Sequence, residues 1–247
     1  KSENYKNGGD PEHRGTGGPL EVEDYRTILD LTHAFVEAGH QAGHPKSPDL
    51  NGSMPEGVGY SQMTRRGRLR GSTARTFLSR AKKRQNVKIE TGAIVTGLIF
   101  SNKKCTGVKF NKKGTEETVL AGKEVILSGG AVNSPHILQI SGIGSEEHLS
   151  SIGVKVIHNL PGVGKNLQDH YVSRISHRVK DTDSINELSR GFKLLREISS
   201  WALQGKGALT FGITSAMVFS RSREGLSSPD IQLLFTPASY SQKTHGE

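Results

Sequence analysis

The stretch at residues 124–144, EVILSGGAVNSPHILQISGIG, limits most strongly what this chain can fold into. The three aliphatic residues at 125–127 predict a short buried strand, and the letters SGGA that follow remove side-chain bulk at a turn. The hydroxyl of Ser134 can cap free backbone N–H groups and Pro135 suits a first helical position, so a helix is expected from there to Gly142. A strand, a glycine turn and a helix start together expose main chain to which the ribose and phosphates of a nucleotide could bind.

Junctions of this kind also serve as packing devices in many α/β proteins, so the junction alone is not specific. The run at residues 130–144, however, resembles the second signature of the glucose-methanol-choline (GMC) oxidoreductases, which are FAD-dependent alcohol oxidases and dehydrogenases. The Ser-Pro pair, the two aliphatic residues after it and the ending SGIG stand at the spacing of that family. Further stretches resemble the family in the same order along the chain: GGPL at 17–20, DLNG at 49–52 with an R-x-x-S-like helix start near Ser72, GAIV at 92–95, and GVGKNLQDH at 162–170.

The resemblance implies where the cofactor FAD would bind. The main-chain N–H and C=O of Val95 would pair with the adenine edge, and the turn at Ser128, Gly129, Gly130 and Ala131 would contact the nucleotide. A main-chain donor and acceptor can recognise adenine whatever the side chain is. The competing account makes Val95 an ordinary core valine. The hypothesis requires Val95 and the residues just past 127 to lie side by side on neighbouring β segments.

The predicted fold class is α/β, mixed α+β in character, with an antiparallel β-meander leading into the key segment. By resemblance, residues 68–170 are part of an FAD-binding domain of the GMC type, and residues 1–67 and 171–247 are segments of a substrate domain with an antiparallel sheet and helices. Periodicity predicts helices at 24–38, 72–81, 134–141, 145–152 and 183–203. It predicts strands at 57–64, 104–111, 116–120, 124–127, 154–157, 171–179, 213–219 and 231–235. Residues 86–100 are predicted to form two consecutive strands or one bent strand broken at 91–92.

The resemblance implies an enzyme that oxidises CH–OH groups of a sugar or alcohol by hydride transfer to flavin. The sequence supplies no G-x-G-x-x-G loop for the pyrophosphate and no histidine in the family's catalytic motif, so no catalytic residue is assigned. We interpret the chain as an internal portion of a longer protein, similar to the insect glucose dehydrogenase-like branch, and predict it to be inactive alone. A catalytically inactive GMC homologue is an alternative.

A second alternative comes from charge. The chain carries a formal net charge of +9, and residues 64–84 hold nine basic residues and no acidic one. This composition is compatible with a basic module for nucleic acid or an acidic partner. Phe77 is the one aromatic residue in the segment, and no helix-turn-helix, zinc-finger or RNP pattern is present. A solvated helix face is therefore favoured, and no nucleic-acid partner is expected.

Other candidate sites are weak. His33, His40 and His44 could suggest a metal cluster. His40 and His44 share a helical spacing only if the helix continues past Gly39, and Pro45 follows directly, so no metal is expected. The adjacent Asp-His pair at 169–170 favours a structural turn. The single Cys105 excludes an internal disulfide. No apolar run has transmembrane length, and a secreted location follows only from the insect relatives. The substrate, the electron acceptor and the oligomeric state stay open.

Overall fold

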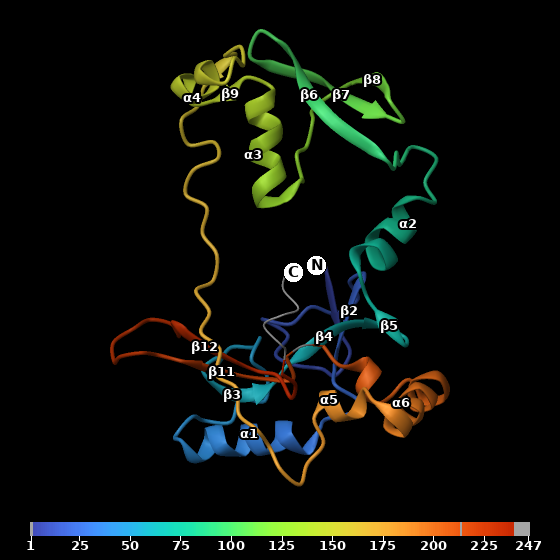
Figure 1. Cartoon of the computed structure of the whole chain (residues 1–247), viewed down its shortest axis with the longest axis vertical. Coiled ribbons are helices and arrows are strands. Elements are labelled where there is room, and N and C mark those ends of the chain that lie inside the picture. Colours follow the sequence, from blue (N-terminus) through green and yellow to red (C-terminus); the bar gives the residue numbers. More distant parts are fainter. Residues whose placement is uncertain (1, 213, 240–247) are drawn as a thin grey trace. The chain divides into compact units, whose positions relative to one another are not determined.

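A computed structural model describes residues 2–212 and 214–239 of the chain. The chain divides into two units, one of Lys1–Val87 with Ile175–Glu247 and one of Lys88–Arg174. Figure 1 shows the elements of each unit along the chain. Each unit is described by itself below. The domain boundaries expected after residues 67 and 170 remain predictions about the whole protein.

The Lys88–Arg174 unit contains the predicted meander as a three-stranded antiparallel sheet in the order β6-β7-β8. Its strands are β6 (Ala93–Ser101), β7 (Lys104–Lys112) and β8 (Thr115–Leu120). Tight turns join them, because Asn102 and Lys113 adopt positive φ values of 55° and 52°. The sheet confirms the meander. The break expected at 91–92 is confirmed, because Gly92 has a φ of 66° and β6 begins after it. The strand expected before the break is wrong, because no strand is assigned at 86–90.

Helix α3 (Gly130–Ile140) follows the meander, and it starts earlier than predicted. Ser134 does not cap its start. The Ser134 hydroxyl lies inside the first turns, where it accepts the N–H of Gly129 at 2.9 Å. Pro135 also lies within the helix, and its missing N–H leaves the carbonyl of Ala131 without the usual helical bond. The predicted end is confirmed, because Gly142 has the left-handed φ of 84° that terminates helices.

The expected strand at 125–127 is wrong, because the structure assigns no strand there. Ile126 has 77% of its surface exposed, so the aliphatic run is not buried. The strand predicted at 171–179 is also wrong, and Tyr171 is 99% exposed. A strand is stable only when its main chain bonds to a neighbour. Within the described residues no strand pairs with either segment. An apolar run can have the side chains typical of a strand and still lack a neighbouring strand to bond with.

The rest of this unit forms a small parallel pair with a short helix beside it. β9 (Ile143–Gly144) pairs with β10 (His158–Asn159), and α4 (Glu146–Ser151) lies between them in sequence. Ser145 stands at the N-cap position of α4 as predicted, but its hydroxyl makes no capping hydrogen bond. The strand expected at 154–157 forms instead at His158–Asn159. Leu149 of α4 is fully buried and is the largest such side chain in the described part of the chain.

The other unit has two sheets, in the orders β1-β2-β4-β5 and β12-β11-β3. β11 pairs antiparallel with both of its neighbours, which confirms a second antiparallel sheet. Position 213 of the predicted strand at 213–219 lies outside the described residues. The elements of this unit are β1 (Glu3–Tyr5), β2 (Leu20–Asp24), α1 (Asp30–Gln41), β3 (Gly57–Tyr60), β4 (Gln62–Arg66), β5 (Leu69–Arg70), the π-helical turn η1 (Ala74–Leu78), α2 (Ser79–Ala81), α5 (Ile185–Leu188), α6 (Gly191–Gln204), the 3₁₀ turn η2 (Ala208–Thr210), β11 (Ala216–Ser220) and β12 (Ile231–Phe235).

The core of this unit forms where α1 crosses the β12-β11-β3 sheet. Val36 of α1 packs with Val58 and Val218 of the sheet. The helix approaches so closely that a Cβ on Gly39 would lie 3.0 Å from a methyl of Val58. Gly39 therefore lies inside α1 as a packing residue, and the prediction that it ends the helix is wrong. The predicted helix start at Asp24 is wrong as well, because β2 pairs with β4 as a strand there.

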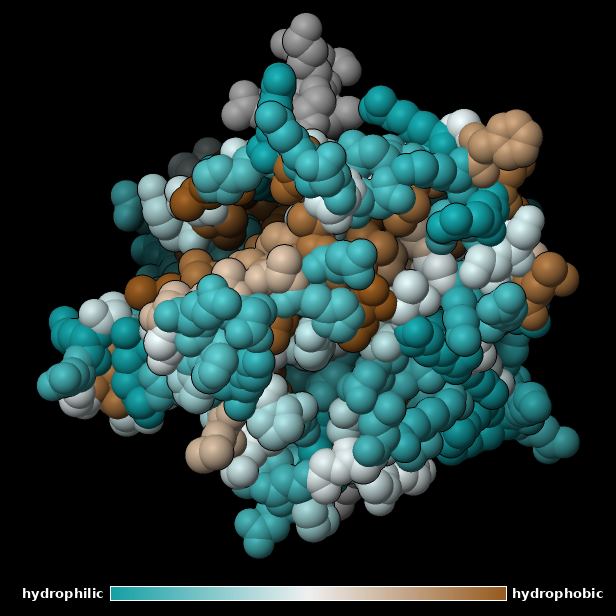
Figure 2. Space-filling model, turned by 90° about the horizontal axis from the view of Figure 1, so that it is seen from below, coloured by the Kyte–Doolittle hydropathy of each residue, from teal (hydrophilic) through white to brown (hydrophobic). Residues whose placement is uncertain are grey.

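The long helix predicted at 183–203 is two helices, α5 and α6, separated at Ser189 and Arg190. The expected glycine break after it is confirmed, because Gly205 caps α6 with a left-handed φ of 66°. Apolar side chains also reach the surface among polar ones, as the face in Figure 2 shows. Ile231 on the edge strand β12, for example, is 41% exposed, although Figure 2 labels no single residue.

Candidate nucleotide site

β6 is an edge strand of its sheet, and its pairing with β7 decides where the main chain of Val95 points. Val95 lies opposite Phe110. On the far side of β7, Ala121 donates its N–H to the carbonyl of Thr106, and alternate residues of an antiparallel strand bond to the same neighbour. Phe110 therefore directs its N–H and C=O to β8. It follows that the N–H and C=O of Val95 point away from β7, to the edge of β6 that no described strand covers.

A β-bulge at Thr96 produces this orientation. The pairing register shifts between Val95 and Gly97, so Thr96 is an extra residue in β6. Beyond the bulge, Leu98 faces the same free edge, because its N–H is bound at 2.9 Å by the hydroxyl of Ser141. Without the extra residue, the two-residue period of the strand would turn the main chain of Thr96 to this edge in place of that of Val95.

The segment after residue 127 forms a loop and the first turn of α3. Ser128, Gly129, Gly130 and Ala131 are all exposed. Gly130 has a φ of 82°, and a Cβ built there would meet nothing within 4 Å. The first N–H groups of a helix have no helical partner and carry the positive end of its dipole. Small exposed residues and main-chain donors are therefore combined here, and this arrangement suits a phosphate or a ribose.

Val95 and residues 128–131 belong to the same unit, in which α3 packs against β6. Figure 1 shows the helix beside the strand. The hypothesis of two neighbouring β segments needs correction on one side, because residues 125–127 form no strand. The second element of the candidate site is a helix start. The assignment of Val95 and residues 128–131 to a nucleotide stays a prediction.

The loop GVGKNLQDH is attached to α3. The side-chain amide of Gln139 donates to the carbonyl of Val163 at 3.3 Å. Gly164 has a φ of 78°, and a Cβ there would lie 2.7 Å from the same amide nitrogen. Asp169 accepts the main-chain N–H of His170 at 2.8 Å. The predicted turn is therefore found at residues 161–164, whereas no turn is assigned at 165–170, so the interpretation of the Asp-His pair as part of a turn stays a prediction.

An exposed carboxylate precedes β6. A hydrogen bond from Lys112, which has the larger effect, and one from Lys88 together lower the pKa of Glu90 to about 2. The ammonium of Lys88 lies 2.8 Å from the carboxylate, and Lys112 stands at the end of β7. The ion pair between Glu90 and Lys112 links the loop before β6 to β7. Exposed ion pairs of this kind contribute little to stability.

Comparison with known proteins decides the family. The family model described as GMC oxidoreductase matches residues 4–172. The chain belongs to the GMC oxidoreductase family. The resemblance inferred from the motifs is thereby confirmed, and so is the mixed α/β fold class. The narrower likeness to the insect glucose dehydrogenase-like branch stays a prediction.

Relatives of this GMC chain include choline dehydrogenases. The oxygen-dependent choline dehydrogenase of Staphylococcus saprophyticus is 41% identical over 233 residues, covering 92% of this chain and 40% of that protein. The mitochondrial choline dehydrogenase of Homo sapiens is 38% identical over 231 residues, covering 92% of this chain and 38% of that protein. The chain thus spans about 40% of the length of the first of these curated relatives.

Solved structures resemble the GMC chain over most of its length. A formate oxidase is 25% identical with a TM-score of 0.77, covering 90% of this chain and 40% of that one. Pyridoxine 4-oxidase from Mesorbium loti is 26% identical with a TM-score of 0.69, covering 89% of this chain and 39% of that one.

The basic segment 64–84 is partly internal. Arg65 has 3% of its side chain exposed and pairs with Glu23 at 3.1 Å. Arg66 and Arg68 donate to main-chain carbonyl oxygens. Every basic residue of the segment except Arg65 is exposed. The expectation that no nucleic acid binds here stays a prediction. Among the described residues, none of the helices combines the length and the apolar character that a membrane span requires.

The histidines considered as metal ligands have separate partners. A ring nitrogen of His33 lies 2.7 Å from the hydroxyl of Tyr60. A ring nitrogen of His40 lies 3.2 Å from the carbonyl of His44. Each interaction is a local hydrogen bond, so the structure gives no support to a cluster.

Sequence reasoning missed another group with the composition of a cation site. Possible ligand atoms of Asp10, Glu12 and His13 lie within 4.8 Å of one another. A ring nitrogen of His13 lies 3.0 Å from one oxygen of Asp10, and the main-chain N–H of Glu12 donates to the other. These bonds account for the cluster, and we assign no metal to it. The close spacing D-P-E-H was the available signal.

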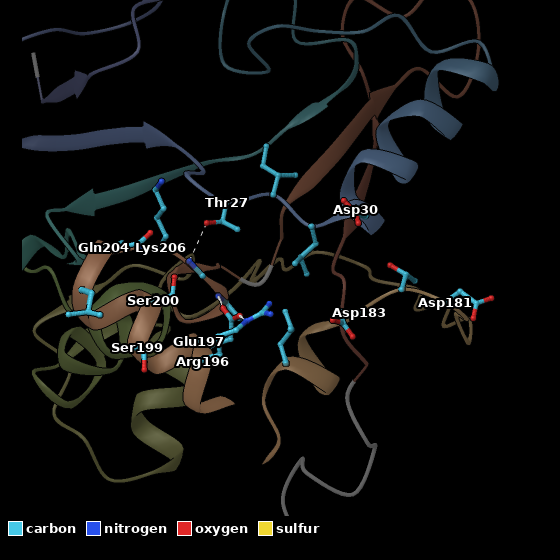
Figure 3. Close-up of a pocket in the computed structure, with 17 residues that line it drawn as sticks. Thr27, Asp30, Asp181, Asp183, Arg196, Glu197, Ser199, Ser200, Gln204 and Lys206 are labelled. Atoms are coloured by element: carbon cyan, nitrogen blue, oxygen red, sulfur yellow. Dashed lines mark hydrogen bonds and ion pairs between the residues drawn. The ribbon is translucent and has the colours of Figure 1, made fainter. Parts of the chain in front are cut away.

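A cavity of about 980 Å³ lies beside α6 in the larger unit. Figure 3 shows carboxylates of Asp30, Asp181, Asp183 and Glu197 around it. Glu197 is bound internally, since its carboxylate accepts the N–H of Ala208 at 2.6 Å. No motif marked the cavity, because its lining comes from segments far apart in the sequence. The sequence-predicted nucleotide residues are not among its lining.

Proposed function

We propose that this chain is part of an FAD-dependent oxidoreductase that oxidises the CH–OH group of a small alcohol or a sugar. The observation that carries the proposal is the GMC family match over residues 4–172. The names of the choline dehydrogenase relatives make a small primary alcohol the first substrate to assay. A secreted location remains a prediction.

The residues present fit the adenine and phosphate half of FAD. Val95 offers a main-chain donor and acceptor at the edge of β6 that no described strand occupies. This donor and acceptor are complementary to the acceptor and donor of adenine. Gly130 leaves open space where any side chain would project. Both features belong to one compact unit, so a ligand that bridges them would be held within that unit.

In this proposal Val95 recognises the adenine, and residues 128–131 contact the ribose or the phosphates through main-chain N–H groups at the start of α3. When bound, FAD supplies the acceptor for the hydride that leaves the carbinol carbon. The hydroxyl proton requires a base. We assign that role to no residue of this chain. Its own contribution is to bind and orient the nucleotide.

The test is flavin retention by the full-length protein and by a matched pair of variants. Gly130→Val places a branched side chain in the space proposed for the nucleotide, so we expect loss of bound FAD. Gly114→Val is the control, because Gly114 also has a positive φ, 88°, with nothing near its Cβ position, but it lies in the turn after β7. Flavin absorbance after gel filtration measures both, and dye reduction with choline measures the activity.

Equal flavin content in the two variants would contradict the proposed site. A full-length protein without flavin would contradict the proposed function. The basic-module alternative predicts nucleic-acid binding that weakens steeply as salt concentration rises. Binding of that kind without flavin would favour it.

A further inference from the structure

Ser141, the residue after α3, attaches the helix to β6. It is 8% exposed. Its hydroxyl donates to the carbonyl of Ile137 at 2.6 Å and accepts the N–H of Leu98 at 2.9 Å. A hydroxyl has one proton, so the bond to Ile137 orients it and leaves its lone pairs for Leu98. Both hydrogen-bonding functions of this buried side chain are therefore used.

The bond reaches the same edge of β6 that presents Val95. Leu98 and Val95 face this edge together because the bulge at Thr96 changes the alternation between them. Their separation along a strand is about 10 Å at the usual rise of about 3.3 Å per residue. The position of Leu98 relative to α3 therefore largely sets the position of the Val95 main chain relative to α3.

The end of α3 that carries Ser141 is itself held from other directions. The carbonyl of Gly142 accepts the N–H of Ile157 at 2.8 Å. Gln139 donates to the carbonyl of Val163. The helix end is thus a fixed point, and the bond from Ser141 transmits that position to β6.

We propose that Ser141 is a positioning residue for the flavin nucleotide. By binding Leu98, it holds the open edge of β6 at a set distance from α3, so that Val95 and residues 128–131 contact one ligand. The inference rests on the proposed function and extends it to a residue that does not itself touch the nucleotide.

Ser141→Ala in the full-length protein tests the proposal. The N–H of Leu98 loses its partner, and we expect the Kd for FAD to rise about tenfold, the size of one neutral hydrogen bond. The decisive comparison uses flavin hypoxanthine dinucleotide, which lacks the adenine amino group. Because this analogue has already lost the pairing with Val95, Ser141→Ala should raise the Kd for the analogue by a clearly smaller factor than the Kd for FAD. Quenching of flavin fluorescence during reconstitution of the apoprotein measures both values.

Two variants serve as controls. Ser141→Thr keeps the hydroxyl, and Ser150→Ala makes the same change at an exposed position of α4. Both should bind FAD close to the unmodified protein. Where Ser141→Ala does not give folded protein, Ser141→Cys repeats the comparison, because sulfur fills a similar volume and accepts hydrogen bonds more weakly.

An unchanged Kd for FAD, or an equal loss for FAD and the analogue, would overturn the positioning role while leaving the proposed function intact. If the unmodified protein binds neither flavin, both proposals fail. A loss restricted to FAD supports the role, because a general loss of folding would affect both ligands alike.

Discussion

Replacing Gly142 with alanine is expected to destabilise the Lys88–Arg174 unit by about 3 kcal/mol. Gly142 has a φ of 84°, and an L-residue in this left-handed region costs about 1 kcal/mol. A Cβ would also lie 2.4 Å from the carbonyl oxygen of Lys155 and 3.0 Å from a side-chain carbon of Ile157. Relief of such overpacking costs about 2 kcal/mol more. The carbonyl of Gly142 binds the N–H of Ile157, so the neighbouring segment cannot move away without losing a hydrogen bond.

Gly114→Ala separates the two costs. Gly114 has a φ of 88° with nothing within 4 Å of the Cβ position, so only the backbone cost of about 1 kcal/mol applies. Urea denaturation followed by far-UV circular dichroism measures the free energy of unfolding of each variant. Equal losses in the two variants would refute the reasoning, because they would show that the approach to Lys155 has no energetic consequence.

Two further outcomes follow from buried polar groups in the larger unit. Arg65→Ala should lower the free energy of unfolding by about 3 kcal/mol, because the buried carboxylate of Glu23 loses one of its two arginine partners and keeps only Arg26, 3.1 Å away. Thermal denaturation measures this, and an equal loss in Arg65→Ala/Glu23→Leu would contradict it. Burial, which has the larger effect, and the hydrogen bond to Asp24 together raise the pKa of Tyr5 from 10.0 to about 12. The contribution of Tyr5 to stability is therefore present below pH 10 and is lost as the pH rises towards 12. Ultraviolet titration of the phenol should show a lower midpoint in Asp24→Asn, and an unchanged midpoint would contradict the role of Asp24.

Short sequence motifs were enough to predict several elements of the fold and the family. The meander β6-β7-β8, the helix end at Gly142, the break after α6 and the family all followed from residues close together in the chain. Turn residues and alternating side chains act locally, and so their sequence reports them directly. The prediction failed for the strands at 125–127 and 171–179, because an apolar run specifies neither a hydrogen-bonding partner nor burial.

The sequence by itself determined the family and the residues proposed to bind the nucleotide. Only the tertiary structure decided how they are presented. The direction of the Val95 main chain depends on the bulge at Thr96, and the bond from Ser141 to Leu98 joins residues 43 positions apart. Arg65, which looks like surface charge in the sequence, is buried against Glu23. The physical reason is that hydrogen-bond direction and burial are set by the neighbours that folding brings together, and these neighbours lie far away along the chain.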